Sequence, residues 1–431
     1  MLLMFKNRMS WMNTKTLIVA SILLCLAESA ATEDFSLPEG FQATVFHEGL
    51  GKIRHLAVRD NGDVYVAKRY AQEIRMFSQS ASYGGLIALR DTNGDGVADV
   101  VEEFGPTDVT TGLAIHDGHL YFSSEVTVYR VPLDDNLVPA AVPEPIAGGF
   151  PLQRSHGSKT LAFDSSGNMY VNSGTPTNSC QEQNNKRESP GLNPCPQLER
   201  GGGIWRFAAD GKLQDQVRDG ERYVTGTRNV VALEWNDDVD RLYFVMHGRD
   251  SLDILWPKKF TREQRVELPA EEFHVAEAGD NFGWPYTYYD HQKAARMLGP
   301  EYGGDGEIKA DGDYKDPLIG FPGHWAPNDL IFHSGTNVPE RYRGGAFIAF
   351  HGSWNRIPLP QAGYNVVFVP MENGQPSGDW EIFADGFAGA EEIRSPADAN
   401  FRPTGLAEGP DGAIYLAEDK VGRIWRITWR D

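Results

Sequence analysis

Cationic, amide and imidazole side chains recur beside segments of this sequence that resemble β-strands. Arg69 follows one such segment, Arg228 and Asn229 precede another, and Arg402 precedes the last. His156 lies in Arg-Ser-His-Gly-Ser-Lys, directly before a further strand-like segment. Arginine pairs with carboxylates through two parallel hydrogen bonds, so these residues would suit a planar polyanion if they met in one pocket. The alternative is that each is an isolated residue with a local partner.

A second group of candidate side chains lies within six consecutive residues. The segment His-Gly-Ser-Trp-Asn-Arg follows another strand-like run and contains His351, Trp354, Asn355 and Arg356. Tryptophan stacks on planar rings, and the other three residues donate hydrogen bonds. We expect these residues and those of the first group to share one pocket, because such mixed polar and aromatic sets line ligand sites.

An acidic segment matches the ligand spacing of a calcium loop. Gly96 permits the sharp turn that such loops need, and calcium takes six to eight oxygen ligands. The expected ligands are Asp91, Asn93, Asp95 and Glu102 through side chains, Val97 through its carbonyl, and Asp99 directly or through water. The flanking residues resemble strands rather than helices, so the site would be structural and not an EF-hand. An acidic, solvated hairpin without a metal is the alternative.

The elements that must position these residues repeat along the chain. Each repeat is an apolar strand, a turn that usually contains Asp-Gly or Asn-Gly, and a second apolar and aromatic strand. Such alternation with a tight turn is typical of a β-hairpin. The copies lie at residues 56–66, 113–122, 161–171, 233–244, 330–350 and 406–416, the fifth with a longer turn.

About six such units, with further strands after most of them, predict an all-β six-bladed β-propeller of four-stranded antiparallel blades over residues 32–431. A lone hairpin cannot bury both faces, whereas a closed ring of blades can. A sandwich or two smaller β domains is the alternative, but no linker rich in Pro, Gly and Ser divides the chain. Long insertions at 174–202 and 251–325 are expected to help build a site.

The first 31 residues have the composition of a signal peptide: a basic start, a short apolar run and small residues at positions 29–31. We therefore expect a secreted protein, located in the periplasm, with no integral membrane segment in the mature chain. The formal net charge of −20 argues against nucleic acid and anionic membranes as partners.

The mature chain would retain two cysteines, Cys180 and Cys195. In an oxidising compartment such a pair predicts a disulfide, and two free thiols are the alternative. No Cys-x-x-Cys-His haem motif occurs. If the protein is a redox enzyme, its electrons must therefore leave through a separate acceptor.

The candidate site residues and the motifs around them resemble those of the pyrroloquinoline quinone (PQQ)-dependent sugar dehydrogenase family, in the branch that includes sorbosone and pyranose dehydrogenases. The resemblance runs from residues 37–42 to 402–406. Between these it includes residues 90–99, 156–158, 227–229, 245–250, 279–285 and 349–356. Where the soluble glucose dehydrogenases have a Lys and a second Arg, this chain has the His351 segment and Asn400, which favours the sorbosone and pyranose branch.

The resemblance implies that PQQ and Ca²⁺ bind in a funnel near the propeller axis. His156 matches the family's catalytic base, Arg228 and Asn229 match its PQQ-contacting pair, and the carbonyls of Gly248 and Arg249 match its calcium ligands. Positions on the cofactor side are matched by Arg69, Arg402, His351, Trp354, Asn355 and Arg356. The implied reaction is the oxidation of a sugar, namely an aldose, a pyranose or a sorbosone-like compound. In it His156 takes the hydroxyl proton, Arg228 stabilises the oxyanion, and a cytochrome or quinone receives the electrons.

Two other functions fit the same fold. One is a non-catalytic propeller that binds a ligand or protein. The other is a calcium-dependent lactonase, which needs side-chain carboxylates at an axial metal; the acidic residues 91–102 instead lie in a hairpin at a blade edge.

Overall fold

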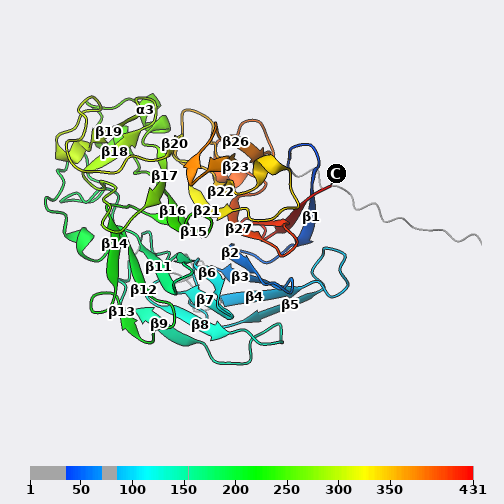
Figure 1. Ribbon diagram of the computed structural model, residues 1–431. Coiled ribbons are helices and arrows are strands. Elements are labelled where there is room, and N and C mark those ends of the chain that lie inside the picture. The colour runs from blue at the N-terminus through cyan, green and yellow to red at the C-terminus, as the bar shows by residue number, and fades with distance from the viewer. Residues whose placement is uncertain (1–34, 70–84, 154, 431) are drawn as a thin grey trace, which may run out of the picture. The chain divides into compact units, whose positions relative to one another are not determined.

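The computed structural model describes residues 35–69, 85–153 and 155–430, and the regular elements of this part of the protein are almost all β-strands (Figure 1). The predicted signal peptide, residues 1–31, lies outside the described residues. Six sheets follow one another along the chain, each built around four antiparallel strands. These strands pair in sequence order in five of the sheets, and the outer strand of the sixth comes from the start of the described chain. The predicted six-bladed propeller of four-stranded antiparallel blades is confirmed.

The first three blades are formed by the N-terminal half of the chain. Blade one is β2 (Ile53–Val58), β3 (Val64–Lys68), β4 (Gly85–Arg90) and β5 (Val100–Phe104). Blade two is β6 (Leu113–His116), β7 (His119–Ser123), β8 (Val128–Pro132) and β9 (Glu144–Gly148), with β13 (Gln214–Asp215) added in parallel to β9. Blade three is β10 (Leu161–Phe163), β11 (Asn168–Ser173), β12 (Gly203–Ala208) and β14 (Glu221–Thr225).

The remaining blades follow the same order, and the last one is completed by the start of the described chain. Blade four is β15 (Val230–Asn236), β16 (Arg241–Met246), β17 (Glu271–Ala276) and β20 (Ile319–Phe321). Blade five is β21 (Pro327–Phe332), β22 (Ala346–His351), β23 (Tyr364–Val369) and β26 (Glu381–Ala384). Blade six is β27 (Pro403–Glu408), β28 (Ile414–Glu418), β29 (Ile424–Trp429) and β1 (Phe41–His47).

Shorter elements lie in the connections between the blade strands. Two hairpins pair β18 (Thr287–Asp290) with β19 (Ala295–Leu298), and β24 (Met371–Glu372) with β25 (Gln375–Pro376). Two short helices, α2 (Leu252–Leu255) and α3 (Arg262–Glu267), lie in the second insertion. Four 3₁₀ turns occur in the described residues, at Pro196–Glu199, Pro300–Tyr302, Glu340–Tyr342 and Pro396–Asp398.

The first strand of each blade borders a central channel. Each of these six strands contacts the first strands of both neighbouring blades, which closes the ring from β27 back to β2. Val58, Phe332 and Glu408, the last residues of their strands, line one channel cavity of about 240 Å³ together with residues of the other three first strands. The last residues of these strands therefore meet at one end of the channel, and their first residues meet at the other. We call the latter the entry end.

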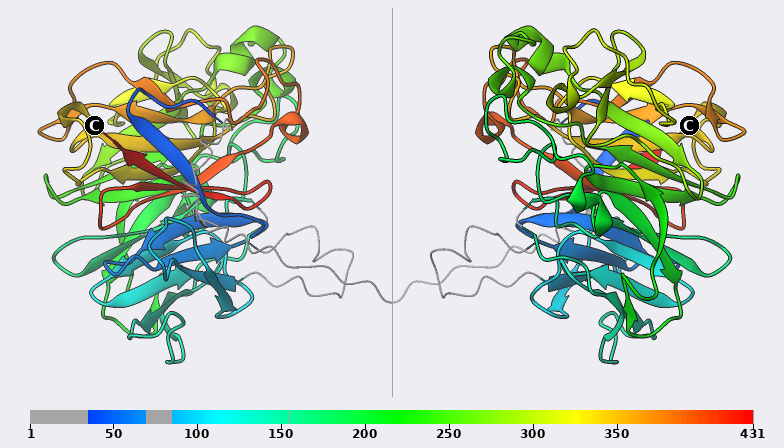
Figure 2. Two further views of the ribbon diagram at one scale, coloured as in Figure 1. Left: turned by 90° about the vertical axis from the view of Figure 1, so that its right-hand side faces the viewer. Right: turned by 90° about the vertical axis from the view of Figure 1, so that its left-hand side faces the viewer.

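The ring is closed by pairing between the two ends of the described chain. Strand β1 is antiparallel to β29, with Phe41 opposite Trp429, and the two lie side by side as the blue and dark red strands of Figures 1 and 2. The apolar core is divided into clusters packed between adjacent sheets, as expected from the alternating apolar residues of each strand. Gly62 and Gly412, both with positive φ, close the hairpin turns of blades one and six, a conformation that other residues rarely adopt.

The first insertion contains the predicted disulfide. Cys180 and Cys195 are bonded, and they pack with the buried indole of Trp284, which belongs to the second insertion. The second insertion has a small core of its own around Leu252, Phe260 and Tyr288. Across the described residues, no helix is long and apolar enough to cross a membrane.

Candidate functional site

Residues of different blades meet at the entry end because of the way each hairpin is paired. In an antiparallel hairpin the start of the first strand lies opposite the end of the second. The register shows this in blades four, five and six, where Val230 pairs with Met246, Pro327 with Phe350, and Pro403 with Glu418. Residues just before a first strand and just after a second strand therefore share one face of the molecule. Most of the predicted site residues occupy such positions.

One half of the site joins blades five, six and one around a carboxylate. His351 Nε2 lies 2.9 Å from Asp419 Oδ1, and Arg54 Nη1 donates to Asp419 Oδ2 at 3.3 Å. Arg402 donates from Nε to the His351 carbonyl at 3.0 Å. Burial would raise the pKa of Asp419, but His351 and Arg54 hold it well below its usual range, so this carboxylate is ionised.

The other half of the site is organised by Arg228, whose buried guanidinium precedes β15. It donates to the Gly248 carbonyl at 2.8 Å, to Asp250 Oδ2 at 3.0 Å, and to the backbone and side chain of Asn178. Asn178 belongs to the disulfide-bonded insertion, which therefore helps to orient this arginine. Asn355 in turn donates to Asp250 Oδ1 at 2.7 Å and so connects blade five to the same carboxylate.

His156 lies beside this arginine group in a strained backbone conformation, with a φ of 53°. Its Nδ1 is 2.7 Å from the Thr175 carbonyl, which can only accept a hydrogen bond. Burial, followed by the positive charge of Arg228, lowers the pKa of His156 to about 3. The imidazole is therefore neutral at physiological pH, with its proton on Nδ1 and the lone pair of Nε2 free to accept another.

The two halves are linked electrostatically through His247, which follows β16. Its Nε2 is 2.6 Å from the Pro327 carbonyl at the start of β21. Burial and the charges of Arg228 from one half and Arg54 from the other together lower its pKa to about 3. The structure thus brings His156, Arg228, Asn355, His351 and Arg402 together at the entry end. We refer to these residues, with Arg54, His247, Asp250 and Asp419, as the axial cluster.

Other predicted cofactor residues occupy different positions. The Arg249 side chain forms a buried ion pair with Glu301, and Arg356 donates to two carbonyls and to Glu267, so both guanidinium groups already have structural partners. Trp354 is 63% exposed. Arg69 is close enough to Arg54 for its charge to lower the pKa of that group. The contacts of Arg69, Trp354 and Arg356 with a cofactor therefore remain predictions, and so does the binding of calcium by the Arg249 carbonyl.

Asn229 stays close to His156. A Cβ placed on Gly174 would meet both side chains, at 2.6 Å from His156 Cβ and 3.3 Å from Asn229 Oδ1. The absence of a side chain at Gly174 is therefore what allows these two residues to approach. Asn229 Oδ1 is buried and has no hydrogen-bond partner in the described chain.

The predicted calcium loop lies in the β4–β5 connection of blade one, and its side chains bond to backbone amides of the loop itself. Asp91 accepts from Gly94 and Gly96, each at 2.7 Å, and Asp99 accepts from both the amide and hydroxyl of Thr92. Asn93 and Asp95 cap the next turns, Val97 is exposed, and Glu102 lies on β5. The described residues contain no group of three or more His, Cys, Asp or Glu arranged to hold a metal. Calcium binding here remains a prediction.

Sequence reasoning missed several members of the axial cluster. Asp250 and Asp419 follow the second strands of blades four and six, just as His351 ends that of blade five, so the repeat itself could have indicated them. His324 has no such signal, because it lies inside the second insertion. Burial alone would lower its pKa, but Asp250, whose Oδ1 is 3.6 Å from Nδ1, raises it.

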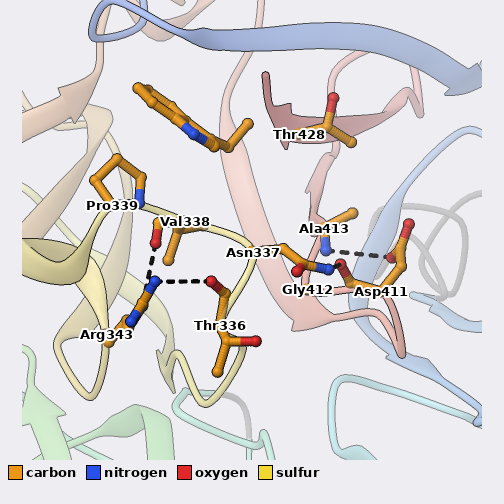
Figure 3. A pocket seen from close by; sticks show the side chains of 10 residues that line it. Thr336, Asn337, Val338, Pro339, Arg343, Asp411, Gly412, Ala413 and Thr428 are labelled. Atoms are coloured by element: carbon orange, nitrogen blue, oxygen red, sulfur yellow. Dashed lines mark hydrogen bonds between the residues drawn. The ribbon is translucent and has the colours of Figure 1, made fainter. Parts of the chain in front are cut away.

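A separate cavity of about 680 Å³ lies between blades five and six at the opposite end from the entry end (Figure 3). It is lined by the β21–β22 and β27–β28 connections. Arg343 donates to the carbonyls of Thr336 and Val338, and Asn337 donates to the Asp411 carbonyl. None of its lining residues belongs to the axial cluster.

Taken together, the fold and the site define a six-bladed propeller with an arginine-rich polar cluster around one end of its axis. Residues 35–430 match the family model described as TrAA12-like, and the chain belongs to that family. This confirms the resemblance to PQQ-dependent sugar dehydrogenases.

Curated relatives match only parts of the chain. A PQQ-dependent pyranose dehydrogenase of Coprinopsis cinerea is 33% identical over 125 residues, which is 26% of this chain and 16% of that protein. An uncharacterised protein of Borreliella burgdorferi is 25% identical over 206 residues, 47% of this chain and 48% of its own length. The chain therefore spans half or less of these relatives.

Solved structures match nearly the whole chain at low identity and support the fold. The PQQ domain of Coprinopsis cinerea pyranose dehydrogenase in its holo form has a TM-score of 0.70 at 19% identity, covering 91% of this chain and 97% of that domain. The calcium structure of the Trichoderma reesei AA12 enzyme has a TM-score of 0.71 at 19% identity, covering 92% and 97%. A PQQ-bound aldose sugar dehydrogenase of Streptomyces coelicolor has a TM-score of 0.55 at 18% identity, covering 92% and 100%.

Proposed function

We propose that the axial cluster oxidises a sugar, with PQQ and Ca²⁺ as cofactors and with electrons passed to an external cytochrome or quinone. The observation that carries this proposal is the neutral His156, whose Nε2 is free to accept a proton beside the buried arginines of the cluster. The family match supports it, as does the structural similarity to the PQQ-bound aldose sugar dehydrogenase of Streptomyces coelicolor. The substrate class follows from the same relatives, which are pyranose and aldose dehydrogenases.

The residues present fit a planar polyanion. Burial and the nearby charges of Arg69 and Arg402 together lower the pKa of Arg54 to about 10. Three guanidinium groups thus lie close to one another, and Asp419 is the carboxylate that faces two of them, Arg54 and Arg402, which leaves positive charge for a ligand to neutralise. Arg54 Nε is also buried without a partner among the described residues. PQQ carries three carboxylates, so Arg54, Arg69 and Arg402 would hold it and Trp354 would contribute a stacking surface.

The opposite side of the cluster fits a hard cation. Calcium prefers oxygen ligands, and the carbonyl of Gly248, the residue before Arg249, lies beside Arg228. The side-chain oxygens of Asn229 and Asn355 are buried and unpartnered in the described part of the chain. Buried oxygens without partners are costly, so ligand binding would relieve that cost.

His156 and Arg228 would carry out the proton and charge steps of the reaction. Bound PQQ would supply the two-electron acceptor to which the sugar carbon transfers its hydride. His156 Nε2 takes the proton of the sugar hydroxyl, while the Nδ1 hydrogen bond to Thr175 fixes the ring orientation. Arg228 stabilises negative charge that develops on the oxygen, and Asp250 and Asn178 hold its guanidinium in place.

Reconstitution of the purified apo-protein tests this proposal. PQQ and Ca²⁺ are added together and singly, and binding is followed by PQQ absorbance while dye-linked oxidation is measured with aldoses, sorbosone and simple alcohols. We expect oxidation of at least one sugar, and only when both cofactors are present. Hydrolysis of lactones by protein lacking PQQ would favour a lactonase. Failure to bind PQQ would favour a binding propeller and overturn the proposal.

A further inference from the structure

A second cavity lies beside the axial cluster at the outer strands of blade five. It has a volume of about 840 Å³ and is lined by Trp325, by residues 361–365 at the start of β23, and by the segment 385–391. From its shape and chemistry we infer that this blade-five cavity binds a neutral saccharide unit, separate from the sugar oxidised at the axial cluster. The binding itself is independent of the proposed oxidation; only its link to turnover rests on that proposed function.

The lining favours a neutral, hydroxylated ligand. Its polar side chains include the amides of Gln361, Asn365 and Asn400, and its aromatic ones include Trp325 and Tyr364. Aromatic rings contact the apolar faces of sugars, and amides bond their hydroxyl groups. The lining contains acidic residues but no Lys or Arg, so it would repel an anion such as a phosphate or carboxylate.

Two buried polar atoms in this cavity lack hydrogen-bond partners among the described residues. They are Asn365 Oδ1, in a residue 4% exposed, and Trp325 Nε1, in a residue 9% exposed. One is an acceptor and the other a donor, and leaving either unpaired costs roughly 1–3 kcal/mol. A hydroxyl both donates and accepts, so the hydroxyl groups of one sugar would satisfy both atoms. A purely apolar ligand would leave both unsatisfied.

Gln361 shows that the amides of this cavity have different roles. It accepts from the Ser353 hydroxyl at 2.8 Å and donates to the Arg394 carbonyl at 3.1 Å. These bonds hold the loop that leads to the axial cluster, so Gln361 forms a rigid wall. Asn365, in contrast, has no side-chain hydrogen bond within the described chain. Asn365 is therefore the residue whose substitution tests ligand binding most directly.

Tyr364 connects this cavity to the axial cluster. It precedes Asn365 on β23, so the two side chains point to opposite faces of the strand. The Tyr364 hydroxyl donates to the Ser353 carbonyl at 2.5 Å, and the Arg402 guanidinium lies 5.7 Å from its ring. A saccharide in the cavity would therefore lie one side chain away from Arg402. This arrangement suits an oligosaccharide or glycoside, with one unit in the cavity and another at the axial cluster.

Binding of neutral oligosaccharides to the PQQ-free protein tests the inference. Cellobiose, maltose and their trimers are titrated while tryptophan fluorescence and calorimetry are recorded. We expect at least one to bind with a Kd on the order of 1 mM or tighter. Asn365→Leu, which keeps the side-chain volume but removes the amide, should weaken that binding at least tenfold. The matched control is Asn337→Leu in the cavity of Figure 3, which should leave binding unchanged.

A second variant shows whether weaker binding by Asn365→Leu could be due to misfolding. Trp325→Phe removes the indole donor while keeping an aromatic ring, and it should weaken the same saccharide several-fold with an unchanged circular dichroism spectrum. Absence of saccharide binding, or binding that neither variant weakens, would overturn the inference. Because no PQQ is present, failure of the proposed oxidation would not affect this result. In the reconstituted enzyme, Asn365→Leu should raise the KM for the oligosaccharide but not for the monosaccharide.

Discussion

The chemistry proposed for His156 depends on its environment more than on its type. Eleven histidines occur in the sequence, and most have no reason to be basic groups at a site. His156 combines three features: a carbonyl fixes its tautomer, burial keeps it neutral, and its backbone adopts a positive φ. His247 shares the first two but not the third. A strained conformation beside a polar cluster is a frequent feature of functional residues.

Replacing His156 with asparagine should remove turnover while leaving cofactor binding intact. Asparagine tolerates positive φ better than most residues, so the loop should keep its shape, but an amide does not accept a proton. We expect kcat to fall about 10²–10⁴-fold with PQQ affinity changed by less than about threefold. His119→Asn, at the first residue of β7, is the matched control. Full activity in His156→Asn would reject the base assignment.

The same prediction extends to the pH dependence of turnover. Because the pKa of His156 is lowered to about 3, its neutral, proton-accepting form persists as pH falls well below the ordinary histidine range. The wild-type kcat should therefore stay level between about pH 7 and pH 5. A loss of kcat centred near pH 6.5 would instead indicate that the His156 imidazole is exposed to water and keeps an ordinary pKa.

Lys159 supplies a prediction about stability that is independent of the site's function. Its side chain is fully buried, and its ammonium group donates to the Gly157 carbonyl at 3.1 Å. Burial lowers its pKa to about 8. Between pH 8 and the unfolded value near 10.5, the unfolded chain holds a proton that the folded chain has lost. Folding stability from this group therefore rises as pH rises through that interval.

Lys159→Met should remove that dependence. The variant should be more stable than the wild type at pH 7, by about 1–3 kcal/mol, because a charged group no longer needs burial. The difference should shrink as pH approaches 10. Urea unfolding at several pH values measures it, with Lys258→Met, whose side chain is 83% exposed, as the control. Equal pH slopes for wild type and Lys159→Met would contradict the prediction.

Among single residues, the repeat was enough to place a residue at the entry end but not to fix the direction of its side chain. His156, Arg228 and Arg402 were found because each directly precedes a first strand. The directions of Arg249 and Arg356 could not be read in this way, since loops lack the alternation that fixes side chains on strands. Both arginines point into ion pairs with glutamates instead.

At the scale of elements, the disulfide-bonded insertion connects stability to the site. Asn178, two residues before Cys180, accepts from Arg228 with both its backbone and side-chain oxygens. The disulfide therefore constrains a loop that orients a proposed catalytic residue. The sequence suggested the cysteine pair, but not this contact, because residues 178 and 228 are related only by the folded insertion.

Removing the disulfide should weaken both the fold and cofactor binding. The bond joins cysteines 15 residues apart, and closing a loop of that size stabilises by about 3 kcal/mol in the chain-entropy model. We expect Cys180→Ser/Cys195→Ser to lose about 2–4 kcal/mol of unfolding free energy in urea. We also expect it to bind PQQ more weakly than the wild type, because Asn178 is less ordered. Wild-type affinity in the double variant would show that Arg228 is oriented without this loop.

At the scale of the whole molecule, the repeat predicted the blades but not how the ring closes. Six hairpins could be recognised because local alternation and turn residues reveal a hairpin. Residues 41–47 belong to no hairpin, and their partner strand lies at the other end of the chain. A pairing over such a distance leaves no local pattern, so only the fold reveals that β1 completes blade six.

Closure by β1 should contribute a large share of the stability of blades five and six. Phe41 is 8% exposed and its ring packs against Phe383 and Tyr342 of blade five and Trp429 of blade six, at centroid distances of 4.9–5.1 Å. Phe41→Ala should therefore cost about 3–5 kcal/mol of unfolding free energy, as for other large-to-small core changes. Gln42→Ala, the adjacent exposed position on the same strand, should change it by less than about 0.5 kcal/mol.

Urea denaturation of both variants distinguishes closure by β1 from a strand that merely lies on the surface. If β1 closes the ring, Phe41→Ala lowers the midpoint of a single cooperative transition. This is expected because a weaker contact between β1 and its neighbours destabilises the closed ring in which every blade is buried. If β1 is peripheral, the midpoint stays within error of the Gln42→Ala value and only the local tryptophan signal from Trp429 changes. The three arginines of the axial cluster come from three different blades, so the first outcome would also be accompanied by weaker PQQ binding near the midpoint.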